Sequence, residues 1–155
     1  MQAMDYLQDQ GLTSHIGVSN FTVSDLEEAR EHASHPITVN QIQYNLLTRN
    51  RRGHYTANME SDIIPYCREH GILIVAYEPL ARAKLTRDVP ELLKQIADKY
   101  EKTPAQLAIN WLINKPGIVA IVKSSNKHHL EENLGALGWH MDPSDLEHLD
   151  AAFPN

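Results

Sequence analysis

The sequence predicts an α/β fold in which about four parallel strands alternate with helices, a (β/α)4-like arrangement equal to a half TIM barrel. Four short apolar runs each end in polar residues and are followed by a helical pattern, which is typical of strand–helix units. Connections of this length imply right-handed parallel crossovers. The alternative is an open, doubly wound nucleotide-binding sheet. That fold normally carries a glycine-rich turn after its first strand, and neither G-x-G-x-x-G nor G-x-x-x-x-G-K-[ST] occurs in the 155 residues.

The first half of the chain contains two of these units after a short helix. Gly11 follows the first helix, and Thr22 or Ser24 offers a hydroxyl that can cap the second. In order, we expect a helix over residues 1–10, a strand over 15–19, a helix from 22 toward 36, a strand over 37–43 and, after a polar stretch over 45–58, a helix to about 70.

The second half contains the other two units. The run over 72–77 is almost continuously apolar, which predicts a strand that is covered on both faces. Pro104 occupies a first-turn helical position, and Pro116 ends the same helix. In order, we expect a strand over 72–77, helices over 90–100 and from 103 toward 115, a strand over 118–122, and helices over 128–137 and 144–151.

Composition and charge exclude several classes of function. The formal net charge of -6 argues against nucleic-acid binding, and the basic run over 49–52 is better explained as a solvated loop. No apolar stretch approaches the roughly 20 residues that cross a bilayer, so we expect no membrane insertion. The single Cys67 excludes an internal disulfide, and with no signal-peptide pattern it predicts a reducing, cytoplasmic location.

Two further candidates for chemistry are better explained as ordinary structure. Cys67 lies between apolar helical positions, with no Cys-His-Asn pattern around it, so we expect a packed structural thiol. His32 and His35 share a helical spacing but lack a third ligand at a matching distance along the chain. No metal site is therefore predicted.

Five segments, in order along the chain, resemble the second half of an aldo-keto reductase. They are residues 15–21 (HIGVSNF), 39–45 (VNQIQYN), 76–81 (AYEPLA), 102–106 (KTPAQ) and 121–133. The resemblance covers essentially the whole chain, from the helix before the fifth barrel strand to the C-terminal helix. It implies one half-barrel domain over residues 1–155.

The resemblance also implies what such a domain lacks. Aldo-keto reductases pass hydride from NADPH to a carbonyl group, while a tyrosine supported by aspartate, lysine and histidine supplies the proton. In the family these four residues lie on the first four strands, and no residue of this sequence matches them. We therefore assign no catalytic residue.

The resemblance does assign positions that bind the nicotinamide end of NADP(H). Hydrogen bonds to the carboxamide group are implied for Ser19, Asn20 and Gln41. The competing explanation for Ser19 and Asn20 is that they cap the following helix. Tyr77 is implied to stack on the nicotinamide ring, and a buried structural tyrosine is the competing explanation.

The middle of the cofactor is assigned to the turn after the third strand. The main chain of Leu80 is implied to lie against the pyrophosphate. Glu78 departs from the family pattern, in which relatives have serine at this place. A carboxylate near phosphates is repulsive unless it points away or meets a cation.

The adenosine end is assigned to the turn and helix after the fourth strand, where free amides and the helix dipole favour anions. His129 stands where the family usually has arginine, so the preference for NADPH over NADH should be weaker or pH-dependent. Glu132 and Asn133 match residues that hold the adenine edge, although solvated helix positions look the same. The residues implied for the 2′-phosphate are Lys123, Ser124, Ser125 and His129.

Four strands leave two open edges and an apolar face that eight strands would close. We expect a homodimer that covers these edges, or pairing with a missing N-terminal half. Three functions stay open. The first is a reductase fragment with weak or lost NADP(H) binding that is inactive alone. The second is an active carbonyl reductase, either with Tyr77 and Lys123 as a substitute acid pair or with a partner that supplies the first four strands. The third is a structural half-barrel module.

Overall fold

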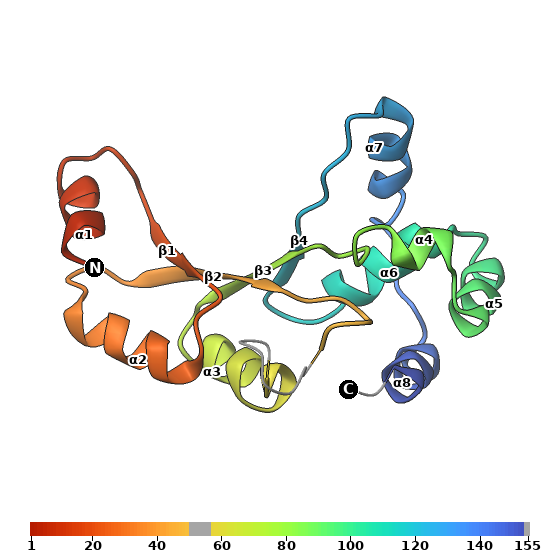
Figure 1. Ribbon diagram of the computed structural model, residues 1–155, viewed down its shortest axis with the longest axis horizontal. Helices are drawn as coiled ribbons and strands as arrows, with labels where there is room; N and C mark the ends of the chain where they lie inside the picture. The colour runs from red at the N-terminus through yellow and green to blue at the C-terminus, as the bar shows by residue number, and fades with distance from the viewer. Residues whose placement is uncertain (50–56, 154–155) are drawn as a thin grey trace.

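The computed structural model describes residues 1–49 and 57–153 and contains one sheet of parallel strands (Figure 1). The strand order is β1-β2-β3-β4, and each neighbouring pair is parallel. This order confirms the predicted half-barrel topology. The strands are β1 (Ile16–Ser19), β2 (Ile37–Gln43), β3 (Leu73–Tyr77) and β4 (Ile118–Ala120).

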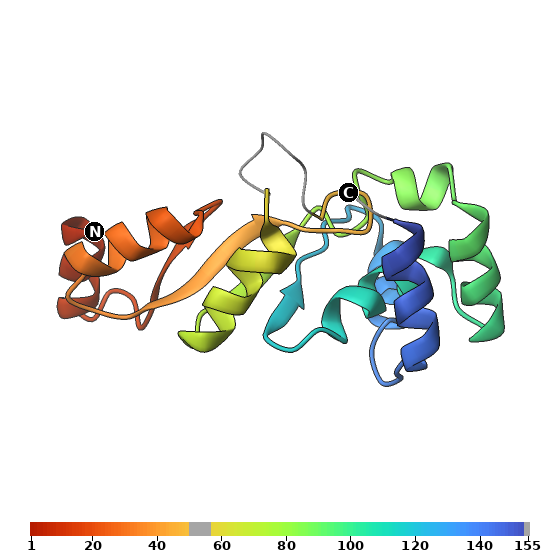
Figure 2. The same cartoon turned by 90° about the horizontal axis from the view of Figure 1, so that it is seen from below.

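Helices precede, connect and follow the strands. In chain order they are α1 (Gln2–Asp9), α2 (Val23–His32), the π-helical turn η1 (Met59–Ile63) with α3 (Ile64–Glu69), α4 (Lys84–Arg87), α5 (Glu91–Lys99), α6 (Pro104–Ile113), α7 (Lys127–Leu134) and α8 (Pro143–Ala152). The sheet runs along the middle of an elongated molecule, with α1 and α2 near one end and α5 and α8 near the other (Figures 1 and 2). The short α4 lies between two predicted elements and was not predicted.

Threonine side chains fix the start of two helices. The Asp25 N–H donates to Thr22 Oγ1 at 3.3 Å, and Asp25 Oδ2 accepts from the Thr22 N–H at 2.8 Å. The same reciprocal capping box joins Thr103 to Gln106 at the start of α6. Each box satisfies amide donors that a helix start leaves unpaired. Thr22, one of the two predicted caps, is thus confirmed.

The hydrophobic core lies on one face of the sheet, against α2, α3 and α6. Ile74 and Ala76 of β3 are buried there with Trp111 of α6. Cys67 of α3 is also fully buried, and this burial raises the pKa of its thiol to about 11. A thiol that stays protonated at neutral pH is the packed structural group that the sequence predicted.

The opposite face of the sheet, which we call the inner face, is open. Exposure along β3 alternates: Leu73 is 38% exposed, whereas Ile74 is 1% exposed. The prediction that this strand is covered on both faces is therefore wrong, because the helices that the structure describes cover only one of them. Strand register and exposure assign these residues to the inner face: Gly17, Ser19, Val39, Gln41, Leu73, Val75, Val119 and Ile121.

The prediction that the basic run over 49–52 is a solvated loop is wrong for Arg49, because the side chain of this residue is buried. It donates from Nε to Glu60 Oε1 at 2.9 Å and from Nη2 to Glu60 Oε2 at 2.7 Å. Its Nη1 donates to the backbone carbonyls of Asp150 and Phe153 at 2.8 and 3.1 Å. The guanidinium therefore fastens α8 to the loop after β2. The rest of the basic run, residues 50–52, lies outside the described residues.

Within residues 1–49 and 57–153, none of the helices has both the length and the apolar character that crossing a bilayer requires.

Candidate functional site

Polar residues from all four strand ends collect along one rim of the sheet, where parallel strands present their carboxyl ends. Ser19 ends β1, Gln43 ends β2 and Tyr77 ends β3. The fourth strand stops at Ala120, earlier than the predicted end at residue 122, so Lys123 stands on an extended segment beyond the sheet. The backbone N–H of Ile121 still donates to the carbonyl of Ala76 at 3.0 Å, which keeps this segment beside β3.

The end of β1 is fixed by its neighbour. Ser19 Oγ and the Asn20 backbone N–H both donate to the Gln41 carbonyl oxygen, each at 2.9 Å. Neither side chain caps α2, because Thr22 does so. Asn20 has a left-handed φ of 61°, and its Oδ1 is buried without a hydrogen-bond partner among the residues that the structure describes. A buried acceptor of this kind can receive an amide N–H from a ligand.

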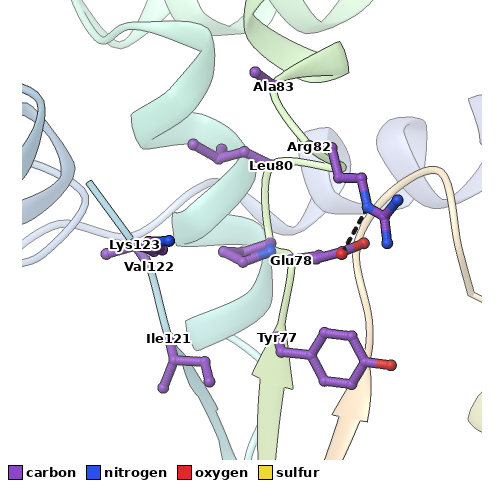
Figure 3. Close-up of a pocket in the computed structure, with 9 residues that line it drawn as sticks. Tyr77, Glu78, Leu80, Arg82, Ala83, Ile121, Val122 and Lys123 are labelled. Atoms are coloured by element: carbon purple, nitrogen blue, oxygen red, sulfur yellow. Dashed lines mark hydrogen bonds and ion pairs between the residues drawn. The ribbon is translucent and has the colours of Figure 1, made fainter. Parts of the chain in front are cut away.

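A pocket of about 460 Å³ lies between the ends of β3 and β4. Figure 3 shows Tyr77, Leu80 and Lys123 around it, so the structure brings together three residues that the sequence assigned to the cofactor. Tyr77 and Leu80 supply apolar surface, while the exposed Lys123 adds a positive charge. The remaining lining residues are Glu78, Pro79, Arg82, Ala83, Ile121 and Val122.

Glu78 meets a cation, which resolves its departure from the family pattern. Arg82 Nε donates to Glu78 Oε1 at 2.7 Å (Figure 3), and Gln43 Nε2 donates to Oε2 at 2.6 Å. Asn45 Nδ2 holds the backbone carbonyl of Glu78 at 2.9 Å. The carboxylate is therefore neutralised and oriented. Sequence reasoning missed Arg82 and Gln43, although the four-residue spacing from Glu78 to Arg82 was a visible signal.

The turn that follows β3 is built from residues in the left-handed region. Ala81, Arg82 and Ala83 have φ values of 50°, 56° and 66°, and the Ala81 N–H donates to the Glu78 carbonyl at 2.9 Å. This conformation carries the chain past Leu80 into α4. Side chains with a Cβ adopt it at a cost of about 1–2 kcal/mol each, so the turn is locally strained.

The segment after β4 forms a tight polar turn. The Asn126 N–H donates to Ser124 Oγ at 3.0 Å, and Asn126 Oδ1 accepts from the His128 N–H at 2.9 Å. Ser124 Oγ also donates to the Asn126 carbonyl at 3.1 Å, so this predicted hydroxyl is engaged within the turn. Lys123 and Ser125 are exposed on either side of it.

The start of α7 carries a compact cluster of His128, His129 and Glu132, whose ring nitrogen and carboxylate atoms lie within 4.8 Å of one another. His129 Nδ1 lies 3.3 Å from Glu132 Oε2, so the predicted phosphate ligand is engaged by a carboxylate. Such a set could also ligate a metal ion, which the sequence did not predict, although the adjacent His-His pair was visible. Asn133 is 9% exposed, so only a small part of it meets solvent.

The donor set fits NADP(H) best at the nicotinamide end. The unpaired Asn20 Oδ1 can accept from a carboxamide, and Tyr77 and Leu80 line a pocket at the same rim. At the phosphate end, Lys123 and Ser125 are exposed near the start of α7. The structure thus places the assigned residues along one rim and on one following helix.

A parallel strand–helix fold with a polar rim and an adjacent pocket is typical of barrel-type α/β proteins, which bind their ligands at the carboxyl ends of their strands. The chain belongs to the aldo-keto reductase family, because the model of the Aldo/keto reductase family matches residues 1–153.

Individual relatives agree with this assignment. The chain is 34% identical to the (1S)-1,7-diacetoxy-luvungin A aldo-keto reductase of Citrus sinensis, over 96% of this chain and 45% of that protein. It is 32% identical to aldose reductase B of Dictyostelium discoideum, over 99% and 46%. An aldo-keto reductase structure from Klebsiella pneumoniae in complex with NADPH is 30% identical with a TM-score of 0.87, over 99% of this chain and 52% of that one. The chain therefore spans about half the length of the relatives it matches.

Proposed function

We propose that this chain is the NADP(H)-binding half of an aldo-keto reductase barrel. The observation that carries the proposal is the pocket at the ends of β3 and β4, which Tyr77, Leu80 and Lys123 line. Aromatic, apolar and cationic surfaces in one cavity match the ring, ribose and phosphate parts of a dinucleotide. Relatives solved with NADP(H) support the choice of ligand.

The nicotinamide end would be held by the rim. Asn20 Oδ1 would accept from the carboxamide N–H, and Ser19 and Gln41 would add hydrogen bonds from β1 and β2. Tyr77 would lie against the ring, an aromatic contact of roughly 0.5–1.5 kcal/mol beyond burial. Such contacts fix which face of the ring points toward a substrate.

The phosphates would be held by the turns after β3 and β4. The main chain near Leu80 would face the pyrophosphate, while Lys123 and Ser125 would face the 2′-phosphate near the start of α7. Glu132 and Asn133 would then meet the adenine edge. His129 would bind the 2′-phosphate less strongly than the arginine of relatives, because its ring nitrogen already faces Glu132.

We further propose that the chain alone binds the cofactor weakly and does not reduce carbonyl compounds. The bound cofactor supplies the hydride, but the family places its proton donor and the supporting residues on the other half of the barrel. The inner face is open, so half of the usual walls around the nicotinamide are missing. Fewer enclosing contacts leave less binding free energy after the cost of association.

Titration of the purified chain with NADPH, followed by calorimetry, tests the binding. We expect saturable binding that Lys123→Met weakens by about tenfold, the equivalent of roughly 1.4 kcal/mol, with a smaller effect on NADH. Lys94→Met is the matched control, because Lys94 is exposed on α5 outside the pocket. Failure to bind NADPH up to about 1 mM, some −4 kcal/mol, would favour a structural module that has lost its cofactor.

An absorbance assay tests the inactivity. Incubation of the chain with NADPH and an aldehyde should cause no loss of NADPH absorbance above that of the buffer. Turnover by the isolated chain would point instead to Tyr77 and Lys123 as the acid pair, and a Tyr77→Phe variant would then abolish it. Turnover that begins only when the first half of a related reductase is added would identify this chain as one part of a split enzyme.

A further inference from the structure

We propose that the inner face binds a second copy of this chain, so that two half-barrels close into one eight-stranded barrel. In the described part of the chain, β1 and β4 each pair with a strand on one side only. Each therefore presents unpaired backbone donors and acceptors at an edge.

The exposed area of the chain is larger than that of a compact protein of its mass. Its accessible surface is 9042 Å² for 17.6 kDa. A compact monomer of this mass exposes about 7,900 Å² by the usual scaling with molecular weight. The excess is about 1,100 Å² per chain; if the inner face and the strand edges account for it, two chains would bury about 2,200 Å² in total, which lies in the range of stable dimer interfaces.

The chemistry of the inner face suits contact between two copies. Its residues are apolar or uncharged, with Leu73, Val75, Val119 and Ile121 supplying most of the apolar surface. The formal net charge of -6 would repel a second copy elsewhere, but the described residues assigned to the inner face carry no charge. An uncharged apolar surface on a chain of this charge favours self-association through that surface.

Two-fold symmetry would make this dimer a closed assembly with no free strand edge. A two-fold rotation about the barrel axis keeps all strands parallel and places β4 of each copy beside β1 of the other, so both seams are the same. Eight parallel strands enclose an interior that side chains fill in layers, each layer taking residues from alternate strands. The chain already has the curvature of such a barrel, because it superposes with a TM-score of 0.87 on half of a complete one.

Sedimentation equilibrium of the whole chain at micromolar concentration tests the proposal. We expect a particle of about 35 kDa, two chains of 17.6 kDa each, with no larger species. Val119→Glu places a charge on the inner face and should shift the particle to a monomer, while circular dichroism reports whether the helices persist. Leu12→Glu is the control, because Leu12 is 72% exposed in the connection between α1 and β1 and is not among the inner-face residues.

Each other outcome overturns the proposal. A folded monomer, or open-ended larger assemblies, would exclude a closed dimer. A dimer that survives Val119→Glu, and also survives the independent inner-face variant Leu73→Glu, would show that the copies meet elsewhere. A monomer that forms a one-to-one complex with the first half of a related reductase would assign the inner face to that half. These results do not depend on whether NADPH binds.

Discussion

Gln106 Nε2 donates a hydrogen bond to the backbone carbonyl oxygen of Glu132 at 2.9 Å and so ties α6 to α7. The same side chain completes the capping box of α6 through Oε1, which accepts from the Thr103 N–H at 3.0 Å. Gly135 leaves room for this contact, since a Cβ at that position would lie 2.2 Å from Gln106 Nε2. One glutamine therefore fixes both the start of α6 and the position of the helix assigned to adenosine.

Replacing Gln106 should disturb stability and cofactor binding together. Gln106→Ala removes the side-chain half of the capping box and the tie to α7, and we expect the free energy of unfolding to fall by about 1–2 kcal/mol, measured by urea denaturation. NADPH affinity should fall several-fold because α7 loses its support. Gln95→Ala on the exposed face of α5 is the control and should change neither quantity. Unchanged NADPH affinity in Gln106→Ala would mean that α7 holds its position without the tie.

The pair of Glu78 and Arg82 should tune the charge at the proposed pyrophosphate site. Arg82→Gln leaves the carboxylate without its cation, so NADPH should bind several-fold more weakly, whereas Glu78→Gln should strengthen binding. Both effects should shrink in high salt because exposed charges are screened. Arg87→Gln on α4 serves as the control. Calorimetric titrations that show equal affinities for both variants would place the pyrophosphate elsewhere.

Glycine should relieve strain in the turn after β3. Ala83 has a φ of 66°, where a Cβ is unfavourable, so Ala83→Gly should raise the free energy of unfolding by roughly 0.5–1 kcal/mol. The matched control is Ala33→Gly, because Ala33 has a φ of -96°, where a Cβ is not strained. This variant should lower the free energy of unfolding by a similar amount, because glycine gives the unfolded chain more freedom. Equal destabilisation by the two substitutions would argue against strain at Ala83.

Glu60 should contribute to stability at neutral pH and lose that contribution in acid. Burial by itself would raise the pKa of Glu60, but hydrogen bonds from Arg49 and Tyr44 outweigh it and lower the pKa. A lowered folded-state pKa gives stability that is present above the unfolded value of about 4.3 and lost as the pH falls through the folded value. Denaturation between neutral pH and pH 3 should show this loss.

A charge-neutral variant isolates the contribution of Glu60. Glu60→Gln should cost roughly 2–4 kcal/mol at neutral pH, because it leaves the buried guanidinium of Arg49 with a weaker partner. The acid loss of stability should then become smaller. Glu27→Gln, on the exposed surface of α2, is the control and should leave the pH profile unchanged. An equally steep profile in Glu60→Gln would assign the acid sensitivity to other carboxylates.

The local features of the fold were readable because they depend on neighbours in the chain. Thr22 and Thr103 mark helix starts through residues three positions away, and the apolar runs mark strands. The rim residues were predictable as a set because parallel strands align their carboxyl ends. The burial and ion pairing of Arg49 were not predictable, since its partner Asp150 lies far along the chain.

The sequence by itself determined the order of the strands and of every described helix except α4, and its motifs carried the resemblance to the aldo-keto reductase family, because motifs and periodicity are local properties of the chain. Only the tertiary structure decided which face of β3 is covered, that Glu78 meets Arg82, and that Ser124 and His129 are engaged by neighbours. These outcomes depend on where packing brings separate side chains, and no periodicity records that placement. The open inner face follows from the same cause, since a strand pattern does not reveal what covers it.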